Sequence, residues 1–220
     1  PAALRLSKLG HEVVIADNFV RRSIEEELGA SSLTPIASIN DRLSGWKEAT
    51  GKTIDFVELT VGKDYDKLRG LIAEFKPDSV VHFAKQRSAP YSMKDAQHKR
   101  YTVDNNINST NDLCAALVET GVDAHIAHLG TMGVYGVGGS DVPEGYLPVR
   151  IETPKGWTEV DILHPAYPGS IYHLTKAQDE LMFAFYARND GLRITDLHQG
   201  IVWGTDTEET KLDERLINRF

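Results

Sequence analysis

Tyr172 and Lys176 lie four positions apart in the segment Tyr172-His173-Leu174-Thr175-Lys176. On a helix this spacing puts the phenol and the ammonium on one face. A neighbouring cation favours the phenolate, so we expect the pKa of Tyr172 to fall from its usual value of about 10 towards neutrality. Such a tyrosine can take a proton from a sugar hydroxyl while hydride leaves the same carbon for an acceptor.

A third candidate for this chemistry is Thr131, which follows Gly130 at the end of a predicted strand. Its hydroxyl could bond the reacting sugar oxygen and help to pass the proton to Tyr172. Lys176 would also orient the ribose of a nicotinamide cofactor. A chance Tyr/Lys pair on a surface helix is the simpler alternative, and the threonine at the strand end argues against it.

Short apolar strands alternate with amphipathic helices along the chain. The predicted strands are 12–16, 54–57, 79–83, 124–129 and 193–197, and the predicted helices lie near 2–9, 65–75, 93–119 and 170–189. This alternation predicts an α/β fold with a doubly wound, Rossmann-type parallel sheet. The segment 137–169, rich in Gly and Pro, is expected to be an inserted loop or hairpin over the active site.

The chain begins with the end of a helix, closed by Gly10, before its first strand. In dinucleotide-binding folds a glycine-rich turn follows the first strand, and an acidic residue about 20 positions later binds a ribose. Asp17 fits that acidic residue, which would place the glycine-rich loop before Pro1. We therefore expect 1–220 to be a truncated NAD-binding domain, with a missing central strand between the strands that end at Asp17 and Phe83.

The pair Asp17-Asn18 ends the first predicted strand. A carboxylate there can accept hydrogen bonds from both ribose hydroxyls of an adenosine and repels a 2′-phosphate, which favours NAD over NADP. Arg21 and Arg22 keep NADP open as an alternative, because arginines can bind that phosphate. An ordinary polar strand end is the simplest interpretation of the same residues.

Arg87 follows the predicted strand 79–83. It should lie at the crevice beyond the carboxyl ends of the parallel strands, where a guanidinium suits a phosphate or sulfonate. Alternatively, Ser88 caps a helix and Arg87 is a solvated charge.

The composition limits other classes of function. A formal net charge of −8 argues against a general binder of nucleic acid or anionic membranes. No apolar run approaches the roughly 20 residues of a membrane span, and no signal peptide is visible. We expect a cytoplasmic protein, or a plastid stromal one if the source is a photosynthetic eukaryote. The single cysteine, Cys114, lies in an apolar helical stretch and should be buried.

The histidines show no metal-binding pattern. His125 and His128 are three positions apart on a predicted strand, so their side chains should point to opposite faces and not share a metal. His164 and His173 could touch the active site, although an ordinary polar role is the favoured interpretation.

Six stretches together resemble the extended short-chain dehydrogenase/reductase family and, within it, the UDP-sulfoquinovose synthases. They are 17–22 (DNFVRR), 31–41 (SSLTPIASIND), 77–93 (PDSVVHFAKQRSAPYSM), 129–136, 172–176 and 195–204 (TDLHQGIVWG). The strings QRSAPYSM and LTPIASI are far more specific than the Tyr/Lys spacing. Neither the glycine motif nor the C-terminal sugar-binding half of that family is present in 1–220.

The resemblance implies an NAD-dependent enzyme that makes UDP-sulfoquinovose, the head-group donor of sulfolipid, from UDP-glucose and sulfite. NAD would oxidise the sugar at C4, water would leave across C5 and C6, sulfite would add at C6, and hydride would return. By motif match, the catalytic residues would be Thr131, Tyr172 and Lys176; the NAD contacts Asp17, Asn18, Arg21, Asn106, Tyr172, Lys176 and Val202; and the substrate contacts Arg87, Thr131 and Gln199.

Related activities remain alternatives. Sugar 4,6-dehydratases carry Thr-Asp-Glu where this chain has Thr131-Met132-Gly133, and epimerases usually have a shorter segment before the tyrosine. Both comparisons favour the synthase over a UDP-sugar 4-epimerase or 4,6-dehydratase. A non-catalytic NAD-binding protein is a second alternative. The chain departs from the synthase pattern at Lys85, Val134 and His198, which replace Glu, Glu and Asn.

The resemblance also bears on assembly. Relatives often dimerise through the helix that bears the tyrosine and the helix that follows Arg87, so we expect a homodimer. Sulfite would arrive free or from a delivering partner protein.

Overall fold

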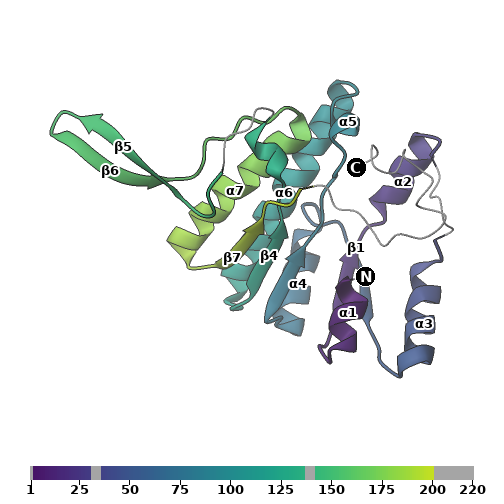
Figure 1. Cartoon of the computed structure of the whole chain (residues 1–220). Coiled ribbons are helices and arrows are strands. Elements are labelled where there is room, and N and C mark those ends of the chain that lie inside the picture. Colours follow the sequence, from purple (N-terminus) through teal and green to yellow (C-terminus); the bar gives the residue numbers. More distant parts are fainter. Residues whose placement is uncertain (1, 31–35, 137–141, 201–220) are drawn as a thin grey trace.

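The computed structural model describes residues 2–30, 36–136 and 142–200, in which strands and helices alternate (Figure 1). The first half contains α1 (Ala2–Lys8), β1 (Val14–Asp17), α2 (Val20–Glu27), α3 (Ile39–Thr50), β2 (Asp55–Glu58), α4 (Tyr65–Phe75), β3 (Ser79–His82) and α5 (Ala89–Ser92). The second half contains α6 (Ala96–Thr120), β4 (His125–Leu129), the 3-10 helix η1 (Met132–Tyr135), β5 (Leu147–Thr153), β6 (Gly156–Ile162), α7 (Ile171–Asp190) and β7 (Arg193–Leu197).

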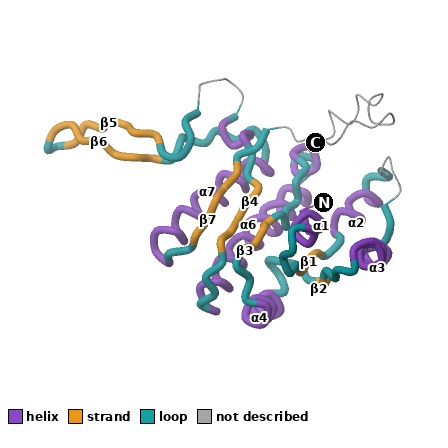
Figure 2. Tube along the Cα trace, turned by 60° about the horizontal axis from the view of Figure 1, so that its bottom comes forward, coloured by secondary structure: helices purple, strands orange, loops and turns teal. Residues whose placement is uncertain are grey.

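The parallel strands form two sheets. β1 pairs with β2, and a second sheet has the order β3-β4-β7. Figure 2 shows the strands in the order β7, β4, β3, β1 and β2 across the molecule. The predicted α/β fold with parallel strands is confirmed. Within the described residues β1 and β3 share no ladder hydrogen bonds, and a further strand between them stays a prediction.

The two longest helices, α6 and α7, have well-defined ends. Asp95 caps α6 by accepting a hydrogen bond from the N–H of His98 at 3.0 Å. Each helix ends at a glycine with positive φ, Gly121 at 64° and Gly191 at 74°, a conformation that costs glycine little. Both helices contribute to the core, α6 through Leu113, Cys114 and Leu117 and α7 through Phe183, and these side chains cluster with Ile126 of β4. The predicted burial of Cys114 is confirmed.

The structure adds helices that the sequence pattern does not predict. The predicted helix 93–119 is α6 alone, and a separate short helix, α5, precedes it, capped by Ser88, which accepts from the N–H of Tyr91 at 3.2 Å. Helices α2 and α3 have no buried residue, and their apolar faces are small: Val20 and Ile24 in α2, and Ile39, Leu43 and Trp46 in α3.

The segment 137–169 contains an antiparallel hairpin. Its strands β5 and β6 are paired from Leu147↔Ile162 to Thr153↔Gly156. The hairpin extends away from the body (Figure 1), whereas the end of the segment returns to it through a hydrogen bond from the N–H of Tyr167 to the Val134 carbonyl at 2.8 Å. Whether the hairpin lies over the active site of the whole protein stays a prediction.

None of the helices in the described ranges combines the length and the apolar character that a bilayer span requires.

Candidate active site

The first turn of α7 is attached to the carboxyl end of the second sheet. The N–H of Tyr172 donates to Ser92 Oγ at 3.1 Å, at the end of α5. One turn later, Lys176 Nζ donates to the carbonyl of Leu129, the last residue of β4, at 2.6 Å. These two contacts place the predicted pair at the strand end that Thr131 follows.

Thr131 begins the short helix η1, which packs against α7. Its hydroxyl oxygen accepts a hydrogen bond from the N–H of Gly133 at 3.1 Å. A Cβ at Gly133 would collide with the ring of His173, so a larger residue there would force that ring to move. The structure therefore brings all three predicted catalytic residues to one region.

The prediction that Lys176 lowers the pKa of Tyr172 is wrong for this structure. Burial, together with the negative charge of Asp179, raises the pKa of Tyr172 to about 12. Lys176 Nζ is directed at the Leu129 carbonyl and at His128 Nε2, 3.0 Å away. Burial, aided by the charge of Lys85, lowers the pKa of Lys176 itself to about 8.

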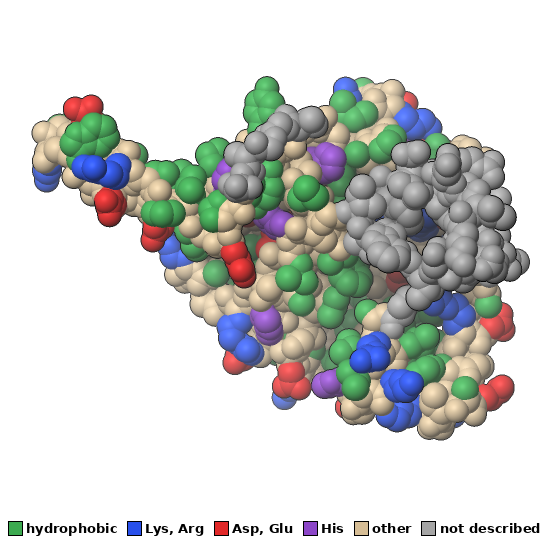
Figure 3. Space-filling view, viewed as in Figure 1, with side chains coloured by type: hydrophobic (Ala, Val, Ile, Leu, Met, Phe, Trp, Pro, Cys, Tyr) green, Lys and Arg blue, Asp and Glu red, His purple; other side chains and the backbone are tan. Residues whose placement is uncertain are grey.

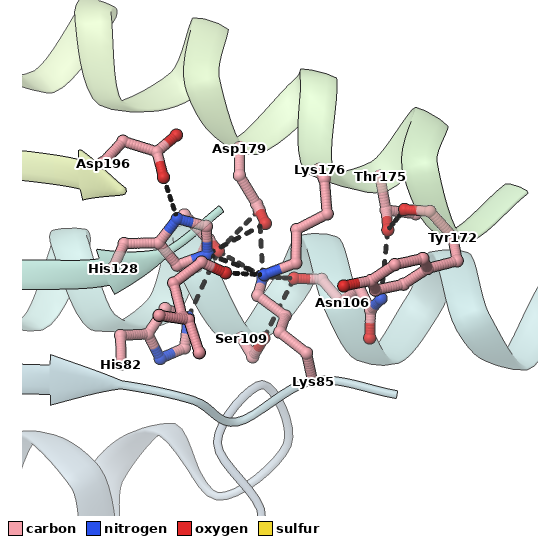
Figure 4. Close-up of polar contacts among 12 residues, drawn as sticks. His82, Lys85, Asn106, Ser109, His128, Tyr172, Thr175, Lys176, Asp179 and Asp196 are labelled. Atoms are coloured by element: carbon pink, nitrogen blue, oxygen red, sulfur yellow. Dashed lines mark hydrogen bonds and ion pairs between the residues drawn. The ribbon is translucent and has the colours of Figure 1, made fainter. Parts of the chain in front are cut away.

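A buried ion pair lies beneath these residues. Lys85 Nζ is 2.9 Å from Asp179 Oδ1, and the hydroxyl of Thr110 donates to the same oxygen at 2.6 Å. Lys85 also donates to the carbonyl of Asn106 and to Thr110 Oγ1. Figure 4 shows the side chains of Asp179 and Lys176 pointing from α7 towards Lys85 and His128.

A second polar chain runs from the same place towards η1. His128 Nδ1 lies 2.7 Å from Asp196 Oδ1, and the other oxygen of Asp196 is 3.0 Å from His198 Nε2. The hydroxyl of Tyr135 meets His198 Nδ1 at 2.5 Å. His125, by contrast, contacts Thr195 on the other face of β4, as the strand periodicity predicts.

The charges along this chain shift its pKa values. Burial opposes the ionisation of Asp196, but hydrogen bonds from His128 and His198 outweigh it and hold the pKa of Asp196 well below its usual range. The hydrogen bond to Asp196 in turn raises the pKa of His198. Burial lowers the pKa of His173, which bonds Ser170 Oγ at 3.1 Å, an ordinary polar contact.

Three of the predicted NAD contacts, Asp17, Asn18 and Arg21, lie at the other sheet. A cavity of about 480 Å³ lies beyond the carboxyl ends of β1 and β2, lined by Asn18, Val20, Ser23, Glu58, Leu59, Thr60, Asp64 and Lys67. Asp17 is exposed beside it, and its Oδ1 accepts from the N–H of Phe19 at 2.7 Å. Leu59 is buried at the end of β2, and binding of an adenosine in this cavity stays a prediction. Arg21 is paired with Glu25 at 2.9 Å.

The remaining predicted residues are placed less decisively. Asn106 is fully buried, and its amide joins the backbone of Gln86 to Thr175 Oγ1 at 3.0 Å, so the structure assigns it a positioning role and a direct NAD contact stays a prediction. Arg87 is exposed. The carbonyl of Gln199 accepts from the N–H of Met132 at 3.0 Å. Val202 lies outside the described residues.

Sequence reasoning missed the buried partners of the active-site pair. Asp179 follows Lys176 by three positions and Tyr172 by seven, so helical periodicity alone places it on the same face. His128 and Lys85 come from other elements, and no local spacing connects them to α7.

Comparison with known proteins identifies the family of this chain. The chain matches the model of the NAD dependent epimerase/dehydratase family over residues 2–220. The chain belongs to this family. The resemblance found in the sequence is therefore confirmed, as is its assignment to a family of enzymes that use NAD.

Two curated relatives are similar over the whole chain. A chloroplastic UDP-sulfoquinovose synthase of Spinacia oleracea is 45% identical over 220 residues, which are 99% of this chain and 44% of that protein. A UDP-sulfoquinovose synthase of Sulfolobus acidocaldarius is 40% identical, over 100% of this chain and 55% of its own. The chain thus spans about half the length of the curated relatives it matches.

Solved structures show the same fold. A UDP-glucose 4-epimerase from Bifidobacterium longum in complex with NAD+ and UDP has a TM-score of 0.59 and 23% identity, covering 89% of this chain and 48% of that one. A UDP-glucose 4-epimerase from Stenotrophomonas maltophila with bound NAD has a TM-score of 0.63 and 20% identity, covering 90% and 48%.

Proposed function

We propose that the whole protein is an NAD-dependent nucleotide-sugar enzyme of the UDP-sulfoquinovose synthase type. It would convert UDP-glucose and sulfite to UDP-sulfoquinovose through a 4-keto intermediate. The observation that carries the proposal is the contact between α7 and the end of β4. There Lys176 donates to the Leu129 carbonyl, which holds Tyr172 and Lys176 near Thr131. The similarity to two named synthases supports the choice of substrates.

Each residue has a part in this proposal. NAD, when bound, accepts a hydride from the sugar and gives it back. Tyr172 takes the proton of the C4 hydroxyl, and the Thr131 hydroxyl bonds the same oxygen. The C4 ketone acidifies the hydrogen at C5, which allows water to leave across C5 and C6 and sulfite to add at C6.

The proposed binding residues are those that the sequence predicts. Asp17 and Asn18, at the end of β1, would hold the adenosine ribose, with Arg21 nearby. Lys176 would orient the nicotinamide ribose. Arg87 and Gln199 would contact the phosphates or the sugar, where a guanidinium matches an anionic group.

An epimerase is the nearest alternative. A UDP-glucose 4-epimerase of Neisseria meningitidis is 32% identical over 70% of this chain. The length of the segment 137–169, with its hairpin, favours the synthase.

The test uses the full-length protein with UDP-glucose and NAD, with and without sulfite, and follows products by mass spectrometry. We expect a sulfonated UDP-hexose only with sulfite, and a loss of about 10²–10⁴-fold in Tyr172→Phe. Tyr186→Phe is the matched control. It removes a tyrosine hydroxyl from the same helix, α7, but one that bonds Asn111 of α6 at 3.0 Å. An epimer or a 4-keto-6-deoxy sugar formed regardless of sulfite would assign the alternative. NAD binding without turnover would indicate a non-catalytic protein.

The exposed apolar side chains of α7 support a homodimer, as predicted from the sequence. Leu181 and Phe185 are exposed on α7, and Val118 is exposed on the neighbouring α6. Burying them in a bundle with a second copy would remove apolar surface from water. Light scattering of the full-length protein tests this: the wild type should have the mass of a dimer and Leu181→Glu that of a monomer. A wild type with the mass of a monomer would contradict the proposal.

A further inference from the structure

His128 has no part in the chemistry described so far, yet it is completely buried in contact with Lys176. It projects from β4 against α7 and β7. From α7 it faces Lys176, Asp179 and the ring of Phe183, and from β7 it faces Asp196. On the β3 side the His82 ring lies 5.5 Å away, and the charge of Lys85 is close enough to act on the same cluster.

The hydrogen bonds of His128 assign one of its two ring protons. Nδ1 is 2.7 Å from Asp196 Oδ1. A lone pair on Nδ1 would face a carboxylate lone pair at that distance, so Nδ1 must carry a hydrogen and donate. Nε2 can either carry a proton or be bare, because it lies 3.0 Å from a donor, Lys176 Nζ, and 3.5 Å from an acceptor, Asp179 Oδ2.

Two proton arrangements satisfy these contacts. In one, Nε2 is bare and accepts a hydrogen bond from the Lys176 ammonium, which leaves Asp179 Oδ2 buried without a hydrogen-bond partner. In the other, Nε2 carries a proton that faces Asp179 Oδ2, and the imidazolium lies between two carboxylates while Lys176 is a neutral amine. Opposite charges nearby stabilise both arrangements.

We propose that His128 stores a proton for the reaction by exchanging it with Lys176. The inference rests on the proposed function. An N–H bond breaks at Lys176 Nζ and one forms at His128 Nε2; the electron pair stays on Nζ, so no oxidant or reductant is required. The neutral amine can then accept the proton that leaves the sugar through Tyr172, which lies one turn earlier on the same face of α7. When the ketone is reduced again, the transfer reverses and the proton returns to the substrate oxygen. His128 is thus a positioning residue that acts through Lys176.

The first test does not depend on turnover. Full-length protein is labelled with ¹⁵N-histidine, and the two ring nitrogens of His128 are followed by NMR against pH in the wild type and in Lys176→Met. We expect Nδ1–H with a bare Nε2 in the wild type. Without the lysine we expect Nε2 to carry a proton as well, because it then faces the Asp179 carboxylate alone. His125, on the other face of β4, is the internal control.

A wild-type His128 with its single proton on Nε2 would overturn the proposal. So would a Lys176→Met protein in which Nε2 of His128 stays bare. If that variant fails to fold, Asp179→Asn gives the same decision in the opposite direction, because losing the second carboxylate must lower the pH at which Nε2 binds its proton.

The second test measures the chemistry. In His128→Gln the amide can accept from Lys176 and donate to Asp196 but cannot take up a proton. We expect unchanged NAD affinity, a fall of at least about 10-fold in NADH formation with UDP-glucose, and a changed pH profile of that step. An unchanged rate and profile would refute the proton store. If the wild type itself shows no turnover, the proposed function fails while the NMR measurement still decides the role of His128.

Discussion

Lys85 and Asp179 form an ion pair 2.9 Å long in which the side chains are 2% and 0% exposed. The pair joins the loop after β3 to the helix that also carries Tyr172 and Lys176. Removing two charges from water costs several kcal/mol for each, and further hydrogen bonds to the ions offset part of that cost. Thr110 donates to Asp179 Oδ1 and the carbonyl of Asn106 accepts from Lys85, whereas Asp179 Oδ2 lies 3.5 Å from His128 Nε2 and has no hydrogen bond within the described residues. The active-site helix therefore depends on a buried charge balance.

Breaking this pair should be more costly than removing it. Lys85→Met leaves the Asp179 carboxylate buried without its cation and should lower the free energy of unfolding by about 3–5 kcal/mol. Lys85→Met with Asp179→Leu should recover most of this loss. Arg193→Met is the control, because its pair with Asp123 is exposed and should contribute less than about 1 kcal/mol. Urea unfolding of the four proteins measures the effects, and a double variant weaker than Lys85→Met would contradict the explanation.

Acid should unfold the protein through its buried carboxylates. Burial alone would raise the pKa of Asp179, but Lys85, His128 and Lys176 together lower it from 3.8 to about 2. As the pH falls the unfolded chain binds the proton first, so the stability from this group is complete above about pH 4 and is lost between about pH 4 and 2. The loss is about 2 kcal/mol.

Urea unfolding between pH 6 and pH 2 measures this loss. The slope should be smaller in Asp179→Asn, which has no proton to gain. Equal slopes in the two proteins would show that Asp179 is not the group responsible.

Gly62 should tolerate no side chain. Its φ is 93°, and a Cβ there would lie 2.7 Å from the backbone nitrogen of Ser109 on α6. Because a helix backbone cannot move aside as a flexible side chain can, Gly62→Ala should destabilise the protein by at least about 2 kcal/mol. Gly70→Ala on α4 meets nothing and should stabilise by about 0.5–1 kcal/mol. Thermal melts compare the two variants. Equal melting temperatures would show that a side chain at position 62 does not clash with the backbone of α6.

Asp17 should determine how tightly NAD is held. Asp17→Asn keeps an oxygen for the N–H of Phe19 but loses the charge that would strengthen bonds to the ribose hydroxyls. We expect the affinity for NAD of the full-length protein to fall about 10-fold or more. The ratio of its affinities for NAD and NADP should fall as well. Asp55→Asn, at the amino end of β2, is the control. Calorimetric titration that finds equal affinities would remove Asp17 from the site.

Apolar periodicity predicted the parts of the fold in which it is strong. Helix 65–75 and strand 193–197 have the bounds expected from the sequence, because both have an apolar face towards the core. Helix α2 escaped detection because it has only eight residues, of which Val20 and Ile24 alone are apolar, too short a run for the periodicity to stand out.

The pKa shifts of the site could not be predicted from the sequence. Helix spacing brought Tyr172 and Lys176 together, but the direction of the tyrosine pKa shift depends on burial and on Asp179. The orientation of Lys176 depends on His128, which comes from β4. Contacts between elements distant in the chain decided these features, and no local pattern encodes them.

The unpaired edge of β3 has a practical consequence for handling this polypeptide. Within the described residues the strand pairs only with β4, and Val81 and Phe83 are 42% and 52% exposed. Hydrophobic surface is visible in the middle of this face of the molecule (Figure 3). An uncovered strand edge flanked by apolar side chains is a template for pairing between copies. Preparations of these 220 residues alone should therefore precipitate increasingly as they are concentrated, and Val81→Lys should delay the precipitation.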